Sequence, residues 1–585
     1  MNAPFARAAE GSVNRAWTRA LELTHRATRD PSRTLPRIAG EWAGRYGDRP
    51  ALVGDEESYT FEALGGRINQ YARWALSRRL EKGATVALMM GNRPEYVAIW
   101  LGLTRVGIVV ALLSPDLRGA ALRHALGVAR AQDILAAEEC APALREAGIA
   151  EPVWTFGAGA ERLDLSIDLF STAPLTEADA PDVSLDDRAL RIFTSGTTGM
   201  PKAAEVSHRK VITWTHWFAG LAGLSADDRL YNCLPMHHSV GGVVAIGAPL
   251  VVGGSAAIAR RFSARRFWSD VARYDCTAFQ YIGELCRYLV AAPSPQQPPA
   301  RLRLALGNGL SAPVWRAFAE RFPDMRVLEF YASTEGNVWL YNVEGRVGAL
   351  GRLPSYLAAK APVALVRFDE EAQAPLRGPD GFCAACEDDQ PGEALGRIAG
   401  DAASRFEGYS EHAETEKKIL RDVFAPGDAW MRTGDLMRRD RDGFYYFVDR
   451  IGDTFRWKGE NVAIAEVTAA LRACPGVADA LVYGVEVPGY EGRAGMATLA
   501  SQQPLDMKAL AAALESLPRW ARPVFLRLTP AIERTETFKP KRALYSGQGF
   551  NPRKCAEPLF MLGDDGYRPL DAELFARVCE GSFRL

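Results

Sequence analysis

The sequence predicts an α/β protein with a large N-terminal α/β domain and a second, smaller α+β domain. From about residue 51 to residue 290, short apolar runs such as Thr85–Met90 alternate with helical patterns such as Phe61–Leu80, which indicates a parallel sheet covered by helices. The 585 residues also exceed the ~250–300 at which single cores stop growing. Beyond Arg450 the expected elements are short: helices at 463–473 and 506–517, and strands at 478–485, 495–500 and 524–528.

Composition narrows the classes of function. The 70 Lys and Arg residues nearly balance the 71 Asp and Glu residues, so the formal charge is −1. Nucleic-acid binders usually carry a marked basic excess, so we expect no nucleic-acid partner. The 9 irregularly placed cysteines do not form a disulfide framework and indicate a reducing compartment. We therefore expect a soluble, cytoplasmic protein.

The first 40 residues are expected to form a helical extension. Residues 11–29 have an amphipathic pattern with Val13, Trp17 and Leu21 on one side. A transit peptide or a membrane-surface helix shares that pattern, but the acidic residues Glu22 and Asp30 dilute the basic face and favour a helix packed on the first domain. Peripheral association of this segment with the inner face of a membrane is left open.

One uncharged run, Ser239–Ala259, meets the ~20-residue length of a bilayer span. Its five glycines and Pro249 interrupt it too often for a stable spanning helix. We expect a buried helix followed by a buried strand instead.

The most informative local motif is IFTSGTTGMPK at 192–202, which follows an apolar strand at 189–193. Glycines let the backbone approach an anion, hydroxyls donate hydrogen bonds, and a lysine adds a point charge. The motif is not a Walker A sequence, since Pro201 and Ala203 stand where that pattern requires Gly and Ser or Thr. We expect a polyphosphate-binding loop rather than a Ser/Thr-rich turn without a ligand. Its candidate residues are Thr194, Ser195, Gly196, Thr197, Thr198, Gly199 and Lys202.

Two further segments offer groups that suit a nucleotide. In EFYASTEG (329–336), a purine could stack on Tyr331, a phosphate could bond to Thr334, and Mg²⁺ could bind Glu335. In TGDL (433–436), Asp435 could accept both hydroxyls of a ribose, and Arg450 adds a guanidinium near the domain junction. Read alone, the first segment is also explained by a strand edge and the second by a surface ion pair.

Two other clusters do not predict a metal site. His237 and His238 are adjacent, so they do not share a helix face as metal ligands would. Cys383 and Cys386 have metal or redox spacing, but no second Cys or His pair lies nearby in the sequence.

Taken together, these segments resemble the adenylate-forming superfamily of acyl-CoA synthetases, peptide-synthetase adenylation domains and luciferases. FTSGTTGMPK, YASTEG, TGDL and the Asp449-Arg450 pair occur in the family's order and spacing. More specifically, the chain resembles the fatty-acid transport protein and very-long-chain acyl-CoA synthetase branch, from about residue 40 to the C-terminus. The segments that carry this resemblance include FSARRFW (262–268), FQYIGELCRYL (279–289), ALGNGL (305–310) and DRIGDTFRWKGENVAIAEV (449–467).

The resemblance implies an AMP-binding domain at 41–449 and a mobile C-terminal domain at 450–585 that carries Lys539. It also implies ATP, Mg²⁺ and coenzyme A as cofactors and cosubstrates. The Thr194–Gly199 loop would hold the ATP phosphates, and Lys202 would neutralise departing pyrophosphate. The remaining nucleotide residues would be Gly307, Asn308 and Tyr331 at the adenine, Thr334 at the α-phosphate, Glu335 at Mg²⁺, and Asp435 at the ribose with Arg450 nearby.

Further roles follow from the same resemblance. His238 matches a histidine beside the acyl pocket, Lys539 the lysine used in adenylation, and Gly459 a position that leaves space for pantetheine. Gly452 would absorb the rotation of the C-terminal domain between the two half-reactions. For the acyl pocket itself, Trp214, Trp217, Phe218 and Tyr281 are lining candidates, although aromatic residues of this kind are more often plain core.

The predicted function is ATP-dependent ligation of a long- or very-long-chain fatty acid to coenzyme A through an acyl-adenylate, with coupling to fatty-acid uptake left open. One alternative is a ligase for a bulky steroid or bile-acid-like carboxylate, or one that delivers the acyl group to a carrier protein. Another is a non-catalytic fatty-acid-binding or uptake module, against which the presence of Lys202, Glu335, Asp435 and Lys539 argues. Chain-length preference and oligomeric state are not predicted.

Overall fold

The fold was analysed in a computed structural model of the chain. The structure describes residues 10–149, 152–157, 161–176, 178–195, 200–293, 299–358, 363–369, 372–400, 404–451, 455–457, 460–462, 464–488, 490, 492–535, 539–563 and 566–582. The chain forms two compact units that are each discontinuous in sequence. Unit 1 comprises residues 1–364, 395–433 and 442–446, and unit 2 comprises residues 365–394, 434–441 and 447–585. The predicted domain limits at 40/41 and 449/450 stay predictions.

The largest sheet of unit 1 has eight strands in the order β14-β13-β12-β11-β9-β10-β1-β2. Its interior pairs are parallel, and only the edge pairs β1/β2 and β13/β14 are antiparallel. Most residues of the parallel strands are buried, as expected where helices cover both faces of a sheet. The strands are β1 (Pro50–Gly54), β2 (Ser58–Thr60), β9 (Arg229–Asn232), β10 (Ser255–Ile258), β11 (Ala278–Ile282), β12 (Leu304–Asn308), β13 (Arg326–Ala332) and β14 (Trp339–Asn342).

A second sheet of unit 1 has six strands in the order β6-β5-β3-β4-β7-β8. All neighbours are parallel except β7 and β8, which form an antiparallel hairpin. The strands are β3 (Thr85–Met89), β4 (Val109–Leu113), β5 (Asp133–Ala137), β6 (Val153–Phe156), β7 (Arg188–Ser195) and β8 (Pro201–Ser207). The predicted α/β arrangement of the N-terminal region is therefore confirmed.

The helices of unit 1 begin and end at local signals. Helix α8 begins after Ser207, whose hydroxyl accepts a hydrogen bond from the Lys210 amide at 3.1 Å, and it ends at Gly223 in the left-handed conformation with φ of 70°. The helices are α1 (Glu10–Thr28), α2 (Leu35–Tyr46), α3 (Phe61–Ser77), α4 (Pro94–Arg105), α5 (Gly119–Ala129), α6 (Ala141–Glu146), α7 (Leu163–Ser166), α8 (His208–Ala222), α9 (Ala245–Leu250), α10 (Phe267–Arg273), α11 (Gly283–Ala291), α12 (Ala312–Arg321), α13 (Ser355–Ala358) and α14 (His412–Glu416).

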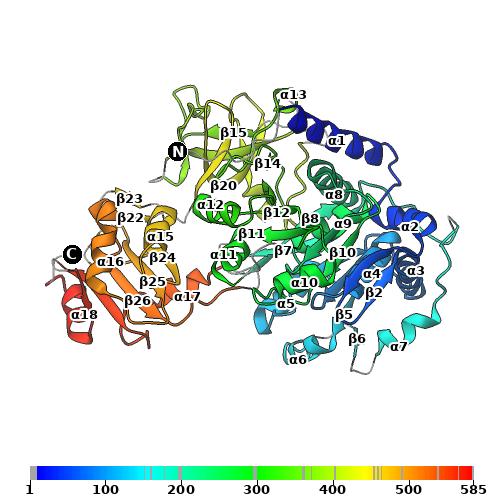
Figure 1. The fold of residues 1–585 in the computed structure, drawn as a ribbon, viewed down its shortest axis with the longest axis horizontal. Coiled ribbons are helices and arrows are strands. Elements are labelled where there is room, and N and C mark those ends of the chain that lie inside the picture. Colours follow the sequence, from blue (N-terminus) through cyan, green and yellow to red (C-terminus); the bar gives the residue numbers. More distant parts are fainter. Residues whose placement is uncertain are drawn as a thin grey trace. The chain divides into compact units, whose positions relative to one another are not determined.

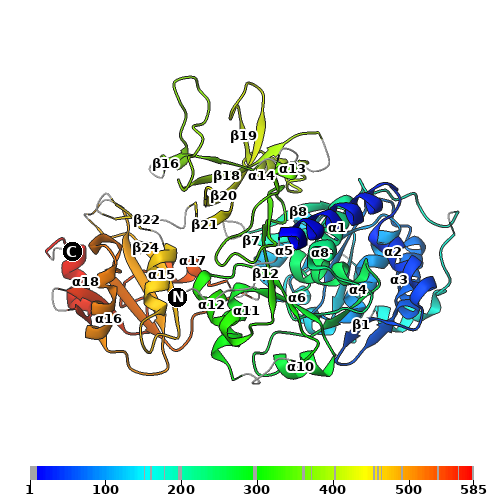
Figure 2. The same cartoon turned by 45° about the horizontal axis from the view of Figure 1, so that its top comes forward.

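The N-terminal helix α1 packs along α8, as both views show (Figures 1 and 2). Trp17 is fully buried in this contact, and Arg19 Nε donates to the Gly220 carbonyl at 2.6 Å. A Cβ atom on Gly220 would lie 2.3 Å from Ala20 Cα, so the close approach requires glycine on α8. The apolar face of α1 is thus used in packing on unit 1.

The uncharged run at 239–259 forms a π-helical turn (Ser239–Val244), the short helix α9 and the buried strand β10. This is the buried helix and strand that the glycine and proline pattern predicts. No helix in the described part of the chain combines the length and hydrophobicity that a bilayer-spanning segment requires.

A further sheet contains β15, β18, β20 and β19 in that order, with β21 paired to β20. Unit 2 has its own five-stranded sheet, β24-β25-β26-β27-β28, in which only β25 and β26 are parallel. Helices α15 and α17 pack against β24 (Figure 1). Helix α16 packs against β28. These are the short elements predicted beyond Arg450, and they form a smaller α+β body.

The remaining strands and helices run from residue 363 to residue 579. The strands are β15 (Val363–Val366), β16 (Phe368–Asp369), β17 (Ala374–Pro375), β18 (Gly392–Ile398), β19 (Ile419–Arg421), β20 (Ala429–Arg439), β21 (Tyr445–Arg450), β22 (Phe455–Trp457), β23 (Glu460–Val462), β24 (Asp479–Val485), β25 (Ala494–Ala500), β26 (Phe525–Thr529), β27 (Leu559–Gly563) and β28 (Gly566–Pro569). The helices are α15 (Ile464–Arg472), α16 (Met507–Ala513), α17 (Arg542–Gln548) and α18 (Ala572–Cys579).

Candidate functional site

The β7/β8 hairpin carries the predicted phosphate loop. Thr194 lies opposite Lys202 in the register, and its hydroxyl donates to the Lys202 carbonyl at 3.5 Å. Ser195 ends β7 opposite Pro201. The four predicted residues at the tip, 196–199, lie outside the described residues, so their contact with phosphates stays a prediction.

Lys202 has protein partners in unit 1. Its ammonium forms an ion pair with Glu414, which also pairs with Lys417. The hydrogen bonds from these two lysines lower the pKa of the Glu414 carboxyl below its ordinary value. The Lys202 ammonium also lies 6.0 Å from the ring centroid of Tyr409, in cation–π range.

Tyr409 connects three of the predicted residues. Besides its ring contact with Lys202, its phenol is hydrogen-bonded to the Glu335 carboxylate and to the Thr194 hydroxyl. Burial, followed by the charge of Glu335, raises the pKa of this phenol above its ordinary value, so the group is protonated and donates to Glu335. The structure thus gathers Thr194, Lys202 and Glu335 around one side chain that the sequence did not single out.

The segment that carries Tyr409 is fixed to β8. The Glu205 amide donates to the Gly408 carbonyl at 3.0 Å, and the Ser410 amide donates to the Ala203 carbonyl at 2.9 Å. These two bonds hold the segment against the strand that follows the phosphate loop.

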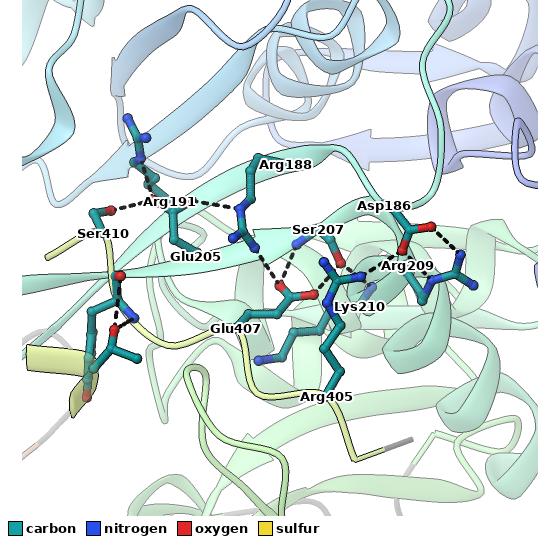
Figure 3. A network of polar contacts seen from close by, with 12 residues as sticks. Asp186, Arg188, Arg191, Glu205, Ser207, Arg209, Lys210, Arg405, Glu407 and Ser410 are labelled. Atoms are coloured by element: carbon teal, nitrogen blue, oxygen red, sulfur yellow. Dashed lines mark hydrogen bonds and ion pairs between the residues drawn. The ribbon is translucent and has the colours of Figure 1, made fainter. Parts of the chain in front are cut away.

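Two buried carboxylates reinforce this attachment (Figure 3). Glu407 accepts hydrogen bonds from the Ser207 amide at 2.8 Å and from its hydroxyl at 2.5 Å. Glu205 accepts from the Ser410 hydroxyl at 2.6 Å and from Arg191 Nε at 3.0 Å. Both ends of the 407–410 segment are therefore hydrogen-bonded to β8, on either side of Tyr409.

The loop between β13 and β14 holds Thr334 and Glu335. Thr334 is hydrogen-bonded to Ser239 through their hydroxyls, with the oxygens 3.0 Å apart. Ser239 directly follows His238, so the predicted α-phosphate residue and the predicted acyl-pocket histidine lie in the same neighbourhood. The ring of His238 lies 4.2 Å from that of His237, whose pKa is lowered by burial and then by His238.

The donor set at Glu335 suits Mg²⁺. It offers a half-buried carboxylate with the hydroxyl of Thr194 close by, and these are hard oxygen ligands. Within the described residues, no group of three or more His, Cys, Asp or Glu side chains could hold a metal ion alone. Mg²⁺ at a nucleotide is usually bound by one or two carboxylates together with phosphates.

The predicted adenine residues lie at the end of β12. A Cβ atom on Gly307 would lie 2.3 Å from the Tyr281 carbonyl oxygen, so this position requires glycine. Asn308 Oδ1 is shielded from solvent and has no hydrogen-bond partner in the described structure. A buried acceptor without a partner is costly, and the amino group of a purine is a suitable donor for it. Tyr331 lies half-buried near the end of β13.

Two residues near this end of the sheet were missed by sequence reasoning. Glu329 accepts from the Tyr281 hydroxyl and from the Leu310 amide at 3.0 Å, and burial raises its pKa to about 8. Gln280 on β11 is fully buried, and neither its amide oxygen nor its amide nitrogen has a hydrogen-bond partner in the described structure. Because strand residues alternate, Gln280 shares a sheet face with Ala278, which packs in the cluster of Trp217 and Phe218.

In unit 2, Asp435 and Arg450 are brought together as predicted. Arg450 Nε donates to Asp435 Oδ1 at 2.9 Å, and the Asp435 carboxylate is buried while Arg450 is about half exposed. The neighbouring Asp449 caps α15 by accepting from the Ile464 amide at 3.1 Å. Lys539 is exposed on a loop, and Gly459 lies outside the described residues, as does the hinge candidate Gly452.

The cysteines form no disulfide in the structure. All nine are free, and Cys383 is buried. Cys386 Sγ donates to the Pro391 carbonyl at 3.6 Å.

Comparisons with known proteins agree with this geometry. The family model described as "AMP-binding enzyme" matches residues 40–378, and the model described as "AMP-binding enzyme C-terminal domain" matches residues 466–539. Long-chain fatty acid transport protein 1 from Rattus norvegicus is 38% identical over 586 residues, which cover 97% of this chain and 90% of the relative. Long-chain fatty acid transport protein 2 from the same species is 37% identical and covers 95% of this chain and 92% of the relative.

Solved structures show the same fold. The anthranilate CoA ligase AuaEII in complex with anthranoyl-AMP has a TM-score of 0.75 at 20% identity and covers 88% of this chain and 97% of that chain. ATP-bound MatB from Rhodopseudomonas palustris has a TM-score of 0.74 at 21% identity and covers 88% and 98%, respectively.

The large α/β unit, the smaller α+β unit and the two matching family models together define the class, and the chain belongs to the AMP-binding, adenylate-forming proteins. Its similarity over almost its full length places it with the long-chain fatty acid transport proteins, so the predicted branch is confirmed.

Proposed function

We propose that the chain is an ATP-dependent acyl-CoA ligase that activates a long-chain fatty carboxylate through an acyl-adenylate. The observation that carries the proposal is the gathering of Thr194, Lys202 and Glu335 in unit 1, three groups of the kinds that a phosphate chain with Mg²⁺ requires. The near full-length similarity to long-chain fatty acid transport proteins supports the choice of substrate class and a link to fatty-acid uptake.

The first half-reaction needs placement and charge stabilisation more than proton transfer. A carboxylate is already ionised at neutral pH, so its oxygen can attack the α-phosphate without a general base. Negative charge then moves onto the departing pyrophosphate, which the ammonium groups of Lys202 and Lys539 would stabilise. Mg²⁺ bound at Glu335 would supply further neutralisation of the phosphates.

The remaining residues would orient the nucleotide and the acyl group. Asn308 Oδ1 would accept from the adenine amino group, and the Asp435 carboxylate would hold the ribose hydroxyls. To contact phosphate, Lys202 would exchange its present partner Glu414 for the nucleotide. In the second half-reaction the thiol of coenzyme A would attack the acyl carbonyl and release AMP, with pantetheine passing Gly459.

The test separates the two half-reactions. ATP–pyrophosphate exchange is measured with a panel of medium- to very-long-chain acids, followed by thioester formation with coenzyme A. Lys539→Ala is expected to lower exchange by ~10²–10³, the usual cost of losing one preorganised charge donor, and to spare coenzyme A attack on preformed adenylate. Equal loss of both half-reactions would contradict the role of Lys539, and no exchange with any acid would favour a non-catalytic binding module.

One observation favours a second candidate function. The amide of Gln280, which has no partner in the described structure, shares a sheet face with Ala278, and Ala278 packs in the cluster of the candidate acyl-pocket aromatics Trp217 and Phe218 on α8. A hydroxylated or steroid-like carboxylate would offer this amide a partner. The same exchange assay with hydroxylated acids and bile-acid-like carboxylates tests this: a clear preference for them over unsubstituted chains would replace the fatty-acid assignment.

A further inference from the structure

Tyr409 lies on a segment whose position is fixed from both sides. Its amide donates to the Thr415 hydroxyl at 2.9 Å, and the same hydroxyl donates back to the Tyr409 carbonyl at 3.2 Å. Together with the bonds from Gly408 and Ser410 to β8, these contacts hold the backbone of Tyr409, from which its side chain extends, in place. The phenol is therefore delivered to one place beside Glu335.

The Tyr409 phenol has two protein partners. Its proton is donated to the Glu335 carboxylate, and it is also hydrogen-bonded to the Thr194 hydroxyl. A glutamate side chain has several rotatable bonds, and Mg²⁺ demands near-ideal octahedral geometry from its ligands. A fixed donor on one carboxylate oxygen restricts that freedom and leaves the other oxygen for the metal.

We propose that Tyr409 is a positioning residue that orients Glu335 for Mg²⁺ and ties this carboxylate to the phosphate loop through Thr194. The proposal rests on the proposed function, because it assigns Glu335 to the Mg²⁺ that accompanies ATP. Tyr409 itself touches neither the metal nor the reacting atoms in this assignment. Its contribution acts through Glu335.

A purely structural role for Tyr409 makes different predictions. If the ring merely filled space, removal of the hydroxyl alone would change nothing that depends on Mg²⁺. If the hydroxyl merely stabilised the fold, its loss would weaken ATP binding equally with and without Mg²⁺. A positioning role predicts that the Mg²⁺-dependent part of binding changes more than the Mg²⁺-free part.

The experiment measures the dissociation constant of ATP by isothermal titration calorimetry, without Mg²⁺ and with saturating Mg²⁺. In Tyr409→Phe, we expect the factor by which Mg²⁺ tightens ATP binding to fall by ~10–100-fold, the usual effect of losing an outer partner of a metal ligand. The Mg²⁺-free constant is expected to change by less than this factor, because the hydroxyl of Thr194 loses one partner but the metal site plays no part without Mg²⁺. Tyr356→Phe, which removes the hydroxyl of a tyrosine that is 49% exposed, is the matched control and should change neither constant.

A double-mutant cycle with Glu335→Gln provides the second measurement. If Tyr409 acts through Glu335, Tyr409→Phe has no further effect on the Mg²⁺ factor in the Glu335→Gln background. Additive losses, or a Tyr409→Phe protein with the full Mg²⁺ factor, overturn the assignment of Tyr409. A wild-type protein that shows the Mg²⁺ factor but exchanges pyrophosphate with no carboxylate would overturn the proposed reaction and leave the role of Tyr409 standing.

Discussion

The phosphate side and the base side of unit 1 differ in how their polar groups are satisfied. On the phosphate side, Lys202 is paired with Glu414, and Glu335 is bonded to Tyr409. On the base side, Asn308 Oδ1 and the amide of Gln280 are buried and have no partner within the described residues. A phosphate on the first side must displace Glu414 from Lys202, whereas a ligand on the second side supplies the first partner.

Whether a buried polar group has a partner decides how its removal changes the free energy of unfolding. Removing a buried group that has a partner leaves that partner unsatisfied, which costs ~1–3 kcal/mol of stability. Removing a buried group that has no partner relieves such a cost in the free protein. Substitutions on the two sides should therefore move the free energy of unfolding in opposite directions.

The largest effect is expected at Lys202. Lys202→Met removes the charge that would stabilise pyrophosphate, and pyrophosphate exchange should fall by ~10²–10³. The matched control is Lys417→Met, because Lys417 pairs with the same Glu414 but is 68% exposed, against 20% for Lys202. The control should leave exchange unchanged. Equal losses in both variants would show that Glu414, and not phosphate, is the relevant partner of Lys202.

Glu329 gives the base side a pH dependence. Its pKa of about 8 in the folded protein lies above the ordinary value of 4.5, with burial as the main cause. The folded state therefore holds a proton that the unfolded state loses. The stabilisation is complete below about pH 4.5 and declines as the pH rises toward 8, by at most ~1.4 kcal/mol per pH unit.

Urea unfolding between pH 5 and pH 9 measures this effect. The free energy of unfolding of the wild type should fall relative to that of Glu329→Gln until the pH reaches about 8, and the two curves should run parallel above it. Curves that are parallel over the whole range would show that Glu329 is already ionised in the folded protein.

The third prediction concerns Asn308. Asn308→Ala should weaken ATP binding by ~3–10-fold, corresponding to the ~0.5–1.5 kcal/mol of one hydrogen bond, and should leave the free energy of unfolding unchanged or raised. Its control is Asn342→Ala, since the buried Asn342 donates to the Arg346 and Ala349 carbonyls at 2.7 Å each. That variant should lose ~1–3 kcal/mol of stability with unchanged ATP affinity. Calorimetry measures the ATP affinity of both variants, and urea unfolding measures their stability. A destabilised Asn308→Ala protein would contradict the conclusion that Asn308 Oδ1 has no partner in the free protein.

The features predicted from sequence are those with local signals. The strand before the phosphate loop, β7, follows from the apolar run at 189–193, a signal that acts over a few residues. Thr194, Lys202 and Glu335 were identified as candidates because residues with the required chemistry occur together in short motifs. Their sequence does not show what holds them in place.

Tyr409 and Glu414 were not predicted from the sequence, and the reason is physical. Their positions depend on the attachment of residues 407–410 to β8, and the bond between Ser207 and Glu407 joins residues 200 positions apart. The residues next to Tyr409 in the sequence do not indicate that pairing.

Gln280 was not predicted for another reason. A single glutamine in an apolar strand does not show whether its amide has a hydrogen-bond partner.

The smallest change in the free energy of unfolding is expected at Gln280, and it tests whether buried groups without a partner destabilise the free protein. Gln280→Met keeps the length of the side chain and removes two buried polar atoms that have no partner in the described structure, so the free energy of unfolding should rise by about 1 kcal/mol. The control is Gln70→Met, because the buried Gln70 donates to the Phe170 carbonyl and accepts from Arg67, both at 3.1 Å, and should be destabilised. If the amide of Gln280 serves a polar group on the acyl substrate, the variant should also shift pyrophosphate exchange toward unsubstituted chains. A Gln280→Met protein that is less stable than the wild type would mean that this amide is satisfied in solution, and the contrast between the two sides would then be confined to Asn308.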